Sequence, residues 1–213
     1  MLVMPQGLFR HGGIPLPWRS ILLGATALLL FLLAGAAPEA LVFDRQAILH
    51  GELWRLLSGH WVHSDLEHAF WDITALLILG CLFEPLLGRR LIPILLSGTI
   101  AVDIWLWWGM PMLDRYCGLS AILNTLMVAG LWELWRERRH PLIVLVGLGA
   151  AMKIILEITT HQAIFTHTAW PSVPETHAVG FLTAVFMAIL TAPGSRIGGR
   201  RSSDPQTEVI GEH

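Results

Sequence analysis

Long apolar runs separated by short polar connections dominate the hydropathy pattern of this chain. Six of these runs have roughly the 17–25 residues that cross a bilayer as an α-helix. They lack the alternation of apolar and polar residues that favours a β-strand, and a helix satisfies its own backbone groups in lipid. The runs occupy residues 21–37, 69–87, 91–112, 119–135, 141–158 and 177–192. The pattern therefore predicts an all-α, polytopic membrane protein with six transmembrane helices.

The composition excludes several other classes of protein. The 213 residues are 54% hydrophobic and 14% charged, whereas soluble domains average roughly 45–50% apolar and about 25% charged residues. These proportions exclude a water-soluble globule and a disordered chain. The sequence has no basic stripe, so we expect no nucleic acid partner. The two cysteines, Cys81 and Cys117, have neither the spacing of a disulfide framework nor that of a thiolate metal site.

The arginines indicate how the helices are oriented. With six helices threaded through a membrane, Arg45, Arg55 and Arg115 lie on one side and the majority on the other. The majority comprises Arg10, Arg19, Arg89, Arg90, Arg136, Arg138, Arg139, Arg196, Arg200 and Arg201. Because positively charged loops face the cytoplasm, both chain ends are predicted to be cytoplasmic. We expect a cytoplasmic segment over residues 1–19, a membrane domain over 20–192 and a flexible cytoplasmic tail over 193–213. The first apolar run is expected to be retained and not cleaved as a signal peptide.

Polar side chains inside the apolar runs are candidate functional groups, because they are costly in lipid. His68, Ser120 and His177 lie near the predicted outer ends of the second, fourth and sixth helices, so they share one depth. A serine needs a base to remove its proton, and the resulting oxyanion needs fixed donors. The grouping therefore indicates nucleophilic acyl transfer. Gly118 and Gly180 would let the backbones that carry these residues approach each other closely.

At these residues the sequence resembles the rhomboid intramembrane serine proteases. The matching motifs run in the order of the family and cover roughly residues 50–190. They are Trp54-Arg55, His63-x4-His68-x3-Asp72, Gly118-Leu119-Ser120 and His177-Ala178-Val179-Gly180. Within the family the chain looks most like the rhombosortases, which are small six-helix bacterial members. Its size, its Tyr-x-Gly-Leu-Ser motif and the spacing Lys153-x3-Glu157 support this.

The resemblance implies a six-helix rhomboid-like bundle and an endopeptidase that cleaves transmembrane segments near their outer end. It implies that Ser120 is the nucleophile, that His177 is the general base, and that His68 and the Ser120 backbone N–H form the oxyanion hole. No cofactor is expected. The implied partners are membrane lipid and single-span or C-terminally tailed membrane proteins, in particular exported proteins that end in Gly-Gly, a helix and a basic cluster. The implied location is the bacterial inner membrane, with the active site open to the periplasmic side.

Three residues depart from the family pattern. Ala121 stands where the family usually has glycine, and Asn124 replaces a ring-bearing residue one turn after the serine. Asp72 stands where the family usually has asparagine, and an ionised carboxylate would repel an oxyanion. Asp72 is therefore either protonated and part of the oxyanion hole, or it holds His68 as a charged donor.

The remaining candidate residues are expected to support the site. Trp54 and Arg55 belong to the segment between the first two helices, and His63 is predicted to fix this segment by hydrogen bonds. Lys153 and Glu157 are four residues apart and therefore lie on one helical face. A neutralised pair at these positions would either stabilise the bundle or contact a substrate tail.

Other functions remain open from the sequence alone. A catalytically inactive rhomboid-like protein that binds transmembrane helices would account for Ala121 and Asp72. An ion-coupled transporter would instead use the ionisable residues within the runs as a path, namely Asp72, Asp103, Lys153 and Glu157. For Asp103 itself, pairing with another helix is favoured over catalysis. The histidines His60, His63 and His68 could together bind a metal ion. This alternative is disfavoured because the chain has no HExxH motif.

Overall fold

Six long helices form the frame of the molecule in the computed structural model, which describes residues 16–164 and 166–192. They are α1 (Trp18–Ala34), α4 (Leu66–Leu87), α5 (Leu91–Ile104), α6 (Ser120–Arg138), α7 (Pro141–Thr160) and α8 (Pro174–Thr191). Each overlaps one of the six predicted apolar runs, which confirms the prediction of a predominantly helical protein. The predicted tail over residues 193–213 and most of the predicted segment 1–19 lie outside the described residues.

Three stretches of the described chain are long and apolar enough to cross a membrane: Leu66–Gly109, Pro141–Thr160 and Pro174–Thr191. The first of them contains both α4 and α5, which the 3-10 turn η2 (Gly88–Arg90) joins. Trp18–Ala34 is a shorter apolar helix. Helix α6 ends in a charged turn that includes Glu133, Glu137 and Arg138, which lowers its apolar character. The number of six transmembrane spans therefore stays a prediction, although all six helices are present.

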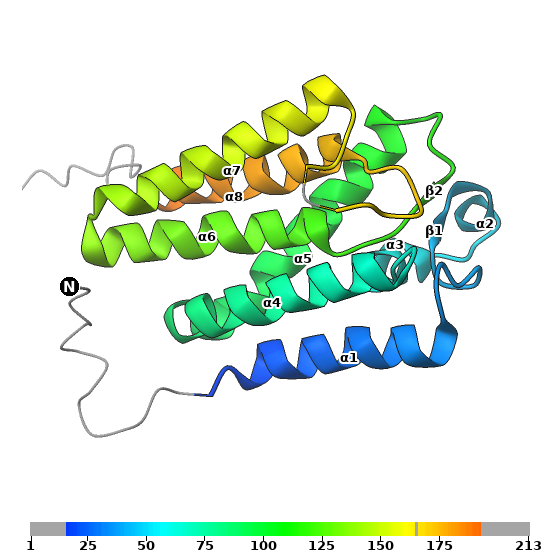
Figure 1. Cartoon of the computed structure of the whole chain (residues 1–213), viewed down its shortest axis with the longest axis horizontal. Coiled ribbons are helices and arrows are strands. Elements are labelled where there is room, and N and C mark those ends of the chain that lie inside the picture. Colours follow the sequence, from blue (N-terminus) through cyan, green and yellow to red (C-terminus); the bar gives the residue numbers. More distant parts are fainter. Residues whose placement is uncertain (1–15, 165, 193–213) are drawn as a thin grey trace, which may run out of the picture.

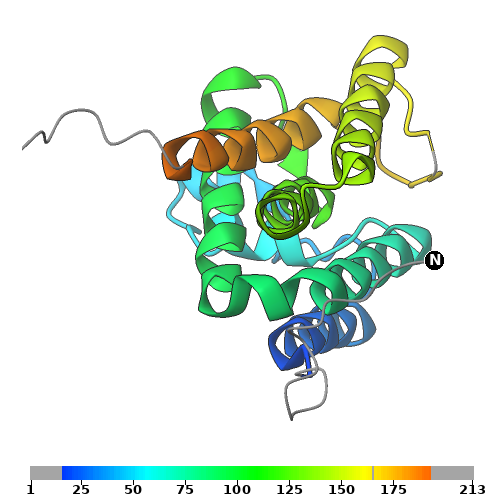
Figure 2. The same ribbon diagram turned by 90° about the vertical axis from the view of Figure 1, so that its left-hand side faces the viewer.

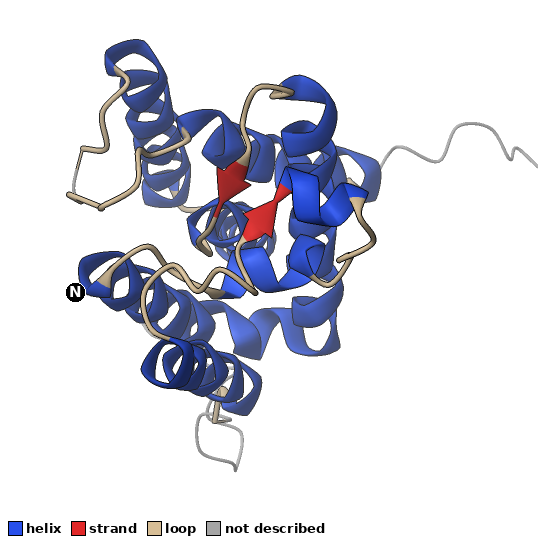
Figure 3. Ribbon diagram, turned by 90° about the vertical axis from the view of Figure 1, so that its right-hand side faces the viewer, coloured by secondary structure: helices blue, strands red, loops and turns tan. Residues whose placement is uncertain are grey.

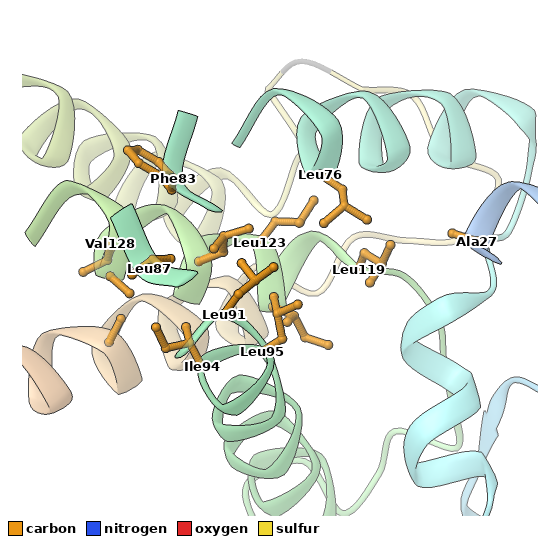
Figure 4. Close-up of a cluster of buried hydrophobic side chains, with 14 residues drawn as sticks. Ala27, Leu76, Phe83, Leu87, Leu91, Ile94, Leu95, Leu119, Leu123 and Val128 are labelled. Carbon is orange, nitrogen blue, oxygen red and sulfur yellow. The ribbon is translucent and has the colours of Figure 1, made fainter. Parts of the chain in front are cut away.

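Helix α6 lies at the centre of the bundle. It packs against α4, α5, α7 and α8, and Figure 2 shows it nearly end-on among them. Figure 4 shows apolar side chains of α4, α5 and α6 gathered in a shared core. Those labelled there include Leu76, Phe83, Leu87, Leu91, Ile94, Leu95, Leu123 and Val128. The start of α6, at Ser120, is therefore held by several neighbouring helices.

Helix α1 lies along α4 at one side of the bundle (Figure 1). Its first turn is fixed by Glu84, a buried residue of α4. The Glu84 carboxylate accepts the backbone N–H groups of Arg19 at 3.1 Å and Ser20 at 2.8 Å, and the Ser20 hydroxyl donates to it at 2.7 Å. The first N–H groups of a helix have no partner within the helix, and a negative charge there is favoured by the helix dipole. Glu84 thus joins the start of α1 to the end of α4.

The segment between α1 and α4 contains short elements at one end of the bundle. They are β1 (Phe43–Asp44), α2 (Arg45–Leu49), α3 (Arg55–Ser58) and the 3-10 turn η1 (Gly59–Trp61). Strand β1 pairs antiparallel with β2 (Arg115–Tyr116), and Phe43 lies opposite Tyr116 (Figure 3). Within the described residues this two-stranded sheet is the exception to the all-α prediction. The sheet connects the segment between α1 and α4 to the residues that precede α6.

Arg45 fixes the far end of α5, which continues as the π-helical turn η3 (Trp105–Gly109). The end of a helix leaves carbonyl groups without partners. The buried Arg45 guanidinium donates to four carbonyl groups in this region, those of Leu106, Trp107, Met110 and Leu113. Along the sequence, Arg45 indicates only the orientation of the helices, so this structural role was not predicted.

Candidate active site

Ser120 and His177 come into direct contact where α6 meets α8. The Ser120 hydroxyl oxygen lies 2.9 Å from Nε2 of His177, although the two residues are 57 positions apart in the sequence. Ser120 is the first residue of α6, and His177 lies in the first turn of α8. His177 is 8% exposed, and Ser120 is half-buried. The two residues that the sequence analysis placed at one depth therefore form a hydrogen-bonded pair.

Gly180 allows α8 to lie close enough to α6 for this contact. A Cβ atom at Gly180 would lie 2.0 Å from the carbonyl oxygen of Ala121, so any larger residue would force the helices apart. The Gly180 carbonyl oxygen also accepts a hydrogen bond from the Thr125 hydroxyl at 2.9 Å. Small residues commonly permit such close helix contacts in membranes. Ala121 is fully buried in this seam.

Gly118 allows the chain before α6 to pass directly over His68. Its φ of 120° is a backbone conformation that residues with a side chain rarely adopt. A Cβ atom there would lie 2.5 Å from Nε2 of His68. The Gly118 N–H donates to the carbonyl oxygen of Gly59 at 3.1 Å, which holds the loop in place. His68 is thereby kept next to the start of α6.

Asp72 lies at the centre of a group of donors. Its Oδ2 atom accepts the backbone N–H groups of Leu119 at 2.7 Å and Ser120 at 3.1 Å. The same oxygen lies 3.4 Å from Nε2 of His63 and 3.3 Å from Nε2 of His68. Of the two interpretations of Asp72, this geometry favours the one in which the carboxylate holds His68. The Ser120 N–H, to which the resemblance gives an oxyanion-hole role, is bonded to Asp72 in this structure.

Asp65 fixes the first turn of α4 and a loop that covers the site. Its carboxylate accepts the N–H of His68 at 2.9 Å, as an N-cap does, and the N–H of Ala169 at 2.6 Å. Ala169 belongs to the loop between α7 and α8. Burial opposes ionisation of Asp65 and is the largest single influence, but the hydrogen bonds from Ala169, His68 and Ser64 together hold its pKa below the ordinary value. The carboxylate is thus charged at neutral pH.

Glu157 lies on the far side of the His177 ring. Its Oε2 atom is 3.2 Å from Nδ1 of His177, and its Oε1 atom is 2.6 Å from Nζ of Lys153. The Lys153–Glu157 ion pair confirms the predicted pairing on one face of the helix. The contact with His177 was not predicted, because the spacing of four residues defines a face of α7 and not its rotation relative to α8.

The remaining predicted site residues lie farther from Ser120 or act on the backbone. The Trp54 indole is exposed and donates to the carbonyl oxygen of Ala40 at 3.1 Å. The buried Arg55 guanidinium pairs with Glu52 at 2.6 Å and also donates to carbonyl groups of the segment between α1 and α4. The Asn124 side chain donates to the carbonyl oxygen of Ser120 at 2.9 Å.

The histidines near the start of α4 divide between two carboxylates. His60 lies 3.0 Å from Asp103, whereas His63 and His68 both face Asp72. The predicted pairing of Asp103 is therefore confirmed, with a partner in the 3-10 turn η1.

A cavity of about 950 Å³ lies in front of the Ser120–His177 pair. Its wall includes residues of α4, α6, α7 and α8, and the loop between α7 and α8 covers part of it. Polar side chains on the wall include His68, Asp72, Ser120, Lys153, Glu157 and His177. Cys117 also lines the cavity, but burial, followed by the charges of Asp72 and Asp65, raises its thiol pKa to about 12. The thiol is therefore protonated at neutral pH, the form in which a cysteine is a poor nucleophile.

The comparison with protein families agrees with this arrangement. A model of the rhomboid domain matches residues 50–194, a stretch that contains every predicted site residue. No curated protein matches the chain. The family and the apolar helices together indicate a multi-pass membrane protein. Because the match covers more than half of the sequence, the chain belongs to the rhomboid family.

Proposed function

We propose that this protein is an intramembrane serine endopeptidase in which Ser120 is the nucleophile and His177 is the general base. The observation that carries the proposal is the 2.9 Å contact between the Ser120 hydroxyl and Nε2 of His177. The pair faces a cavity that is large enough to admit a short extended peptide and water. A serine that only caps its own helix would not require an imidazole at this position.

The chemistry follows from this geometry. Nε2 of His177 takes the proton from the Ser120 hydroxyl as its oxygen attacks the scissile carbonyl carbon. The protonated His177 then gives this proton to the leaving amine, so that an ester of Ser120 remains. Water from the cavity hydrolyses the ester by the same route, with His177 again acting as base. The products are two peptide fragments and the regenerated enzyme.

The oxyanion of the tetrahedral intermediate needs donors near Ser120. In this proposal they are the His68 ring and the backbone N–H of Ser120, which lies at the positive end of the α6 dipole. Both face Asp72 in the structure. The Ser120 N–H therefore exchanges Asp72 for the oxyanion during the reaction.

The substrates of this proposal are membrane proteins that are cut near the outer end of a transmembrane segment. Within the family, the spacing of Lys153 and Glu157 supports a rhombosortase, which would take exported proteins with a Gly-Gly, helix and basic-cluster tail. The proposed location is the bacterial inner membrane, with both chain ends in the cytoplasm and the cavity open to the periplasm. The proposed membrane domain comprises residues 20–192.

A second candidate function is supported by Asp72. If its carboxylate never releases the Ser120 N–H, the protein would bind transmembrane helices without cleaving them. A transporter is less well supported, because the ionisable residues that it would use form local pairs, such as His60 with Asp103 and Lys153 with Glu157.

Cleavage and active-site labelling test the proposal together. Purified protein in lipid vesicles is incubated with tagged single-span substrates, with and without a Gly-Gly tail, and separately with a fluorophosphonate probe. Ser120→Ala and His177→Ala are expected to abolish both cleavage and labelling, because each removes half of the pair. Ser97→Ala is the matched control, since the Ser97 hydroxyl donates to a carbonyl group within α5. Cleavage by Ser120→Ala would refute the proposal, and substrate binding without labelling of the wild type would favour the inactive binder.

A further inference from the structure

A buried carboxylate lies directly behind the proposed base. The His177 ring contacts Ser120 through Nε2 at 2.9 Å and Glu157 through Nδ1 at 3.2 Å. Ser120 belongs to α6 and Glu157 to α7, so the ring lies between two helices. We infer that Glu157 is a positioning residue that fixes the tautomer and the orientation in which His177 accepts the Ser120 proton. This inference rests on the proposed function.

The tautomer follows from the two contacts of the ring. A carboxylate can only accept a hydrogen bond, so the ring nitrogen that faces Glu157 has to carry hydrogen. In a neutral imidazole the other nitrogen, Nε2, then has a free lone pair directed at Ser120. Without the carboxylate, the hydrogen could equally reside on Nε2, and such a ring cannot accept a proton from Ser120. Glu157 therefore selects the reactive form of His177.

The burial of Glu157 is otherwise difficult to explain. Of the residues of α7, all of which the structure describes, Ile154 and Glu157 are the buried ones. Glu157 is 1% exposed, on a helix whose remaining faces carry exposed apolar side chains such as Leu145 and Leu148. A carboxylate inside a membrane protein is expensive and is usually retained for a function. The helix thus turns a charged residue inward at the position of His177.

The second oxygen of Glu157 is held by two donors. Lys153 approaches Oε1 to 2.6 Å, and the backbone N–H of Ile164 donates to the same atom at 3.2 Å. The positive charge of Lys153 keeps the carboxylate ionised, and the amide of Ile164 fixes its plane. Oε2 is left directed at His177. The Lys153–Glu157 pair therefore supports the site, which gives it a more specific role than general stabilisation of the bundle.

The Glu157 carboxylate has the same role in each proton transfer. When Ser120 attacks, its O–H bond breaks, a C–O bond forms to the substrate, and Nε2 of His177 gains the proton. The ring is then positively charged, and the neighbouring Glu157 carboxylate stabilises that charge while Nδ1 keeps its hydrogen. The proton leaves Nε2 for the departing amine. Glu157 stays ionised throughout and exchanges no proton.

Other ionisable groups surround the cavity without standing behind the ring. They are His68 and Asp72 of α4, Arg115, Tyr116 and Cys117 before α6, Lys153 of α7, His161 after α7, and Glu175 of α8. On α5, Asp103 faces His60. Among the described groups around the cavity, Glu157 is the one that hydrogen-bonds with Nδ1 of His177.

Variants at position 157 test the inference. In the vesicle assay, Glu157→Gln is expected to lower kcat by about 10²- to 10⁴-fold with little change in KM, because a glutamine can donate to Nδ1 and favour the unreactive tautomer. The pH profile of the remaining activity is expected to change, because the charged group that faces Nδ1 of His177 is gone. Glu157→Asp, which keeps the charge, is expected to restore part of kcat. A purely structural role would move neither the pH profile nor the balance between kcat and KM.

Two controls keep the result interpretable. Glu133→Gln removes a carboxylate that pairs with Arg90 at the end of α6, and it is expected to leave kcat unchanged. The double variant Lys153→Met with Glu157→Gln removes both charges, so it tests the loss of Glu157 without leaving Lys153 unbalanced. Thermal unfolding in detergent identifies variants that fail to fold.

The outcomes separate the inference from the proposed function. If Ser120→Ala abolishes cleavage but both Glu157→Gln and the folded double variant keep wild-type kcat and pH profile, the inference is wrong and the protease assignment stands. If Ser120→Ala still cleaves, the proposed function itself is wrong. In that case, titration of the His177 ring by NMR in wild type and Glu157→Gln still reports whether the carboxylate acts on the ring, and identical titrations would overturn the contact.

Discussion

At Asp72, one carboxylate oxygen receives two backbone N–H groups and faces two imidazole rings. This is the kind of donor group that stabilises a tetrahedral oxyanion, and here a side chain of the protein occupies it. In the protease that we propose, the negative charge of Asp72 therefore competes with the oxyanion for the Ser120 N–H. The same charge also joins α4 to the start of α6, so stability and activity make opposite demands on this residue.

Asp72→Asn is expected to raise kcat/KM about tenfold, which corresponds to about 1.4 kcal/mol. A neutral amide holds the Ser120 N–H less strongly than a carboxylate does, so the donor is released more easily. The same change is expected to lower the free energy of unfolding by about 1–2 kcal/mol. Steady-state cleavage rates and thermal unfolding measure the two effects.

Glu84→Gln provides the matched control for Asp72→Asn. Glu84 is also a buried carboxylate that accepts two backbone N–H groups, but it does so at the start of α1. Its loss is expected to lower stability without changing kcat/KM. A loss of activity in Asp72→Asn as large as that in Ser120→Ala would show that the charge itself is required.

The loop between α7 and α8 forms part of the cavity wall, and two hydrogen bonds hold it to the start of α4. The Asp65 carboxylate accepts the N–H of Ala169, and the Glu67 carboxylate accepts the N–H of His167 at 3.0 Å. In both hydrogen bonds a backbone N–H of the loop donates to a carboxylate. The strength of these bonds therefore depends on the charge of the two acidic side chains. Because described residues of this loop line the cavity next to Ser120 and His177, we expect its position to affect how open the cavity is.

The hydrogen bond between the Asp65 carboxylate and the loop is expected to weaken at low pH. Because the pKa of Asp65 is lowered in the folded protein, its contribution to stability is complete above the ordinary aspartate value of about 3.9 and is lost as the pH falls through the lower folded value. Asp65→Asn should therefore loosen the loop already at neutral pH. Hydrogen exchange at the amides of residues 166–169 measures this, and exchange should be faster in the variant than in wild type.

Asp114→Asn is the control for the loop, since Asp114 is exposed and lies before α6. It should leave exchange in the loop unchanged. Equal protection of the loop in Asp65→Asn and wild type would show that other contacts hold it.

The arginine-containing turn and the elements around the two strands lie at opposite ends of the bundle (Figure 1). The turn η2 with Arg89 and Arg90 lies at one end, and β1, β2, α2 and α3 lie at the other. Figure 1 also shows the beginning of α1 and the end of α8 at the end that carries η2. Because arginine-rich connections face the cytoplasm, the end with the two strands is expected to face the periplasm.

Single cysteines introduced at exposed positions test this orientation. In a variant that lacks Cys81 and Cys117, a cysteine at Glu39 should react with a membrane-impermeant maleimide in intact cells, because Glu39 lies at the end with the strands. A cysteine at Arg139, in the turn between α6 and α7, should react only after the membrane is permeabilised. The reverse pattern would contradict the orientation derived from the arginines.

The sequence predicted the parts of this molecule that depend on local properties. Apolar run length predicted the six helices, and α4 begins at Leu66, three residues before the predicted run. The shared depth of Ser120 and His177 also followed from local features, because a helix has a fixed rise per residue. The shared depth predicted that Ser120 and His177 lie at the same level of the bundle. Their direct contact depends in addition on Gly180, which allows α8 to pack closely against α6.

The missed features all depend on how separate elements are rotated and aligned. Glu157 contacts His177 because of the rotation of α7 relative to α8, and the spacing of four residues contains no information about that rotation. The same holds for the pairing of β1 with β2 and for the carbonyl groups that Arg45 binds, which come from residues more than sixty positions away. Such contacts are tertiary, and hydropathy along the chain does not determine them.

Helix α7 buries little of its surface, and one of its two buried residues is Glu157. A helix that is so exposed to lipid adjusts its tilt to the thickness of the surrounding hydrocarbon layer. A tilt of α7 moves Glu157 relative to His177, which is anchored through α8 to α6. Ser120 and His177 are held together by the close packing of α6 and α8, whereas Glu157 belongs to the more exposed α7. If His177 is the base that we propose, membrane thickness is therefore expected to alter the support that Glu157 gives it, and lipid composition is expected to change the rate of cleavage.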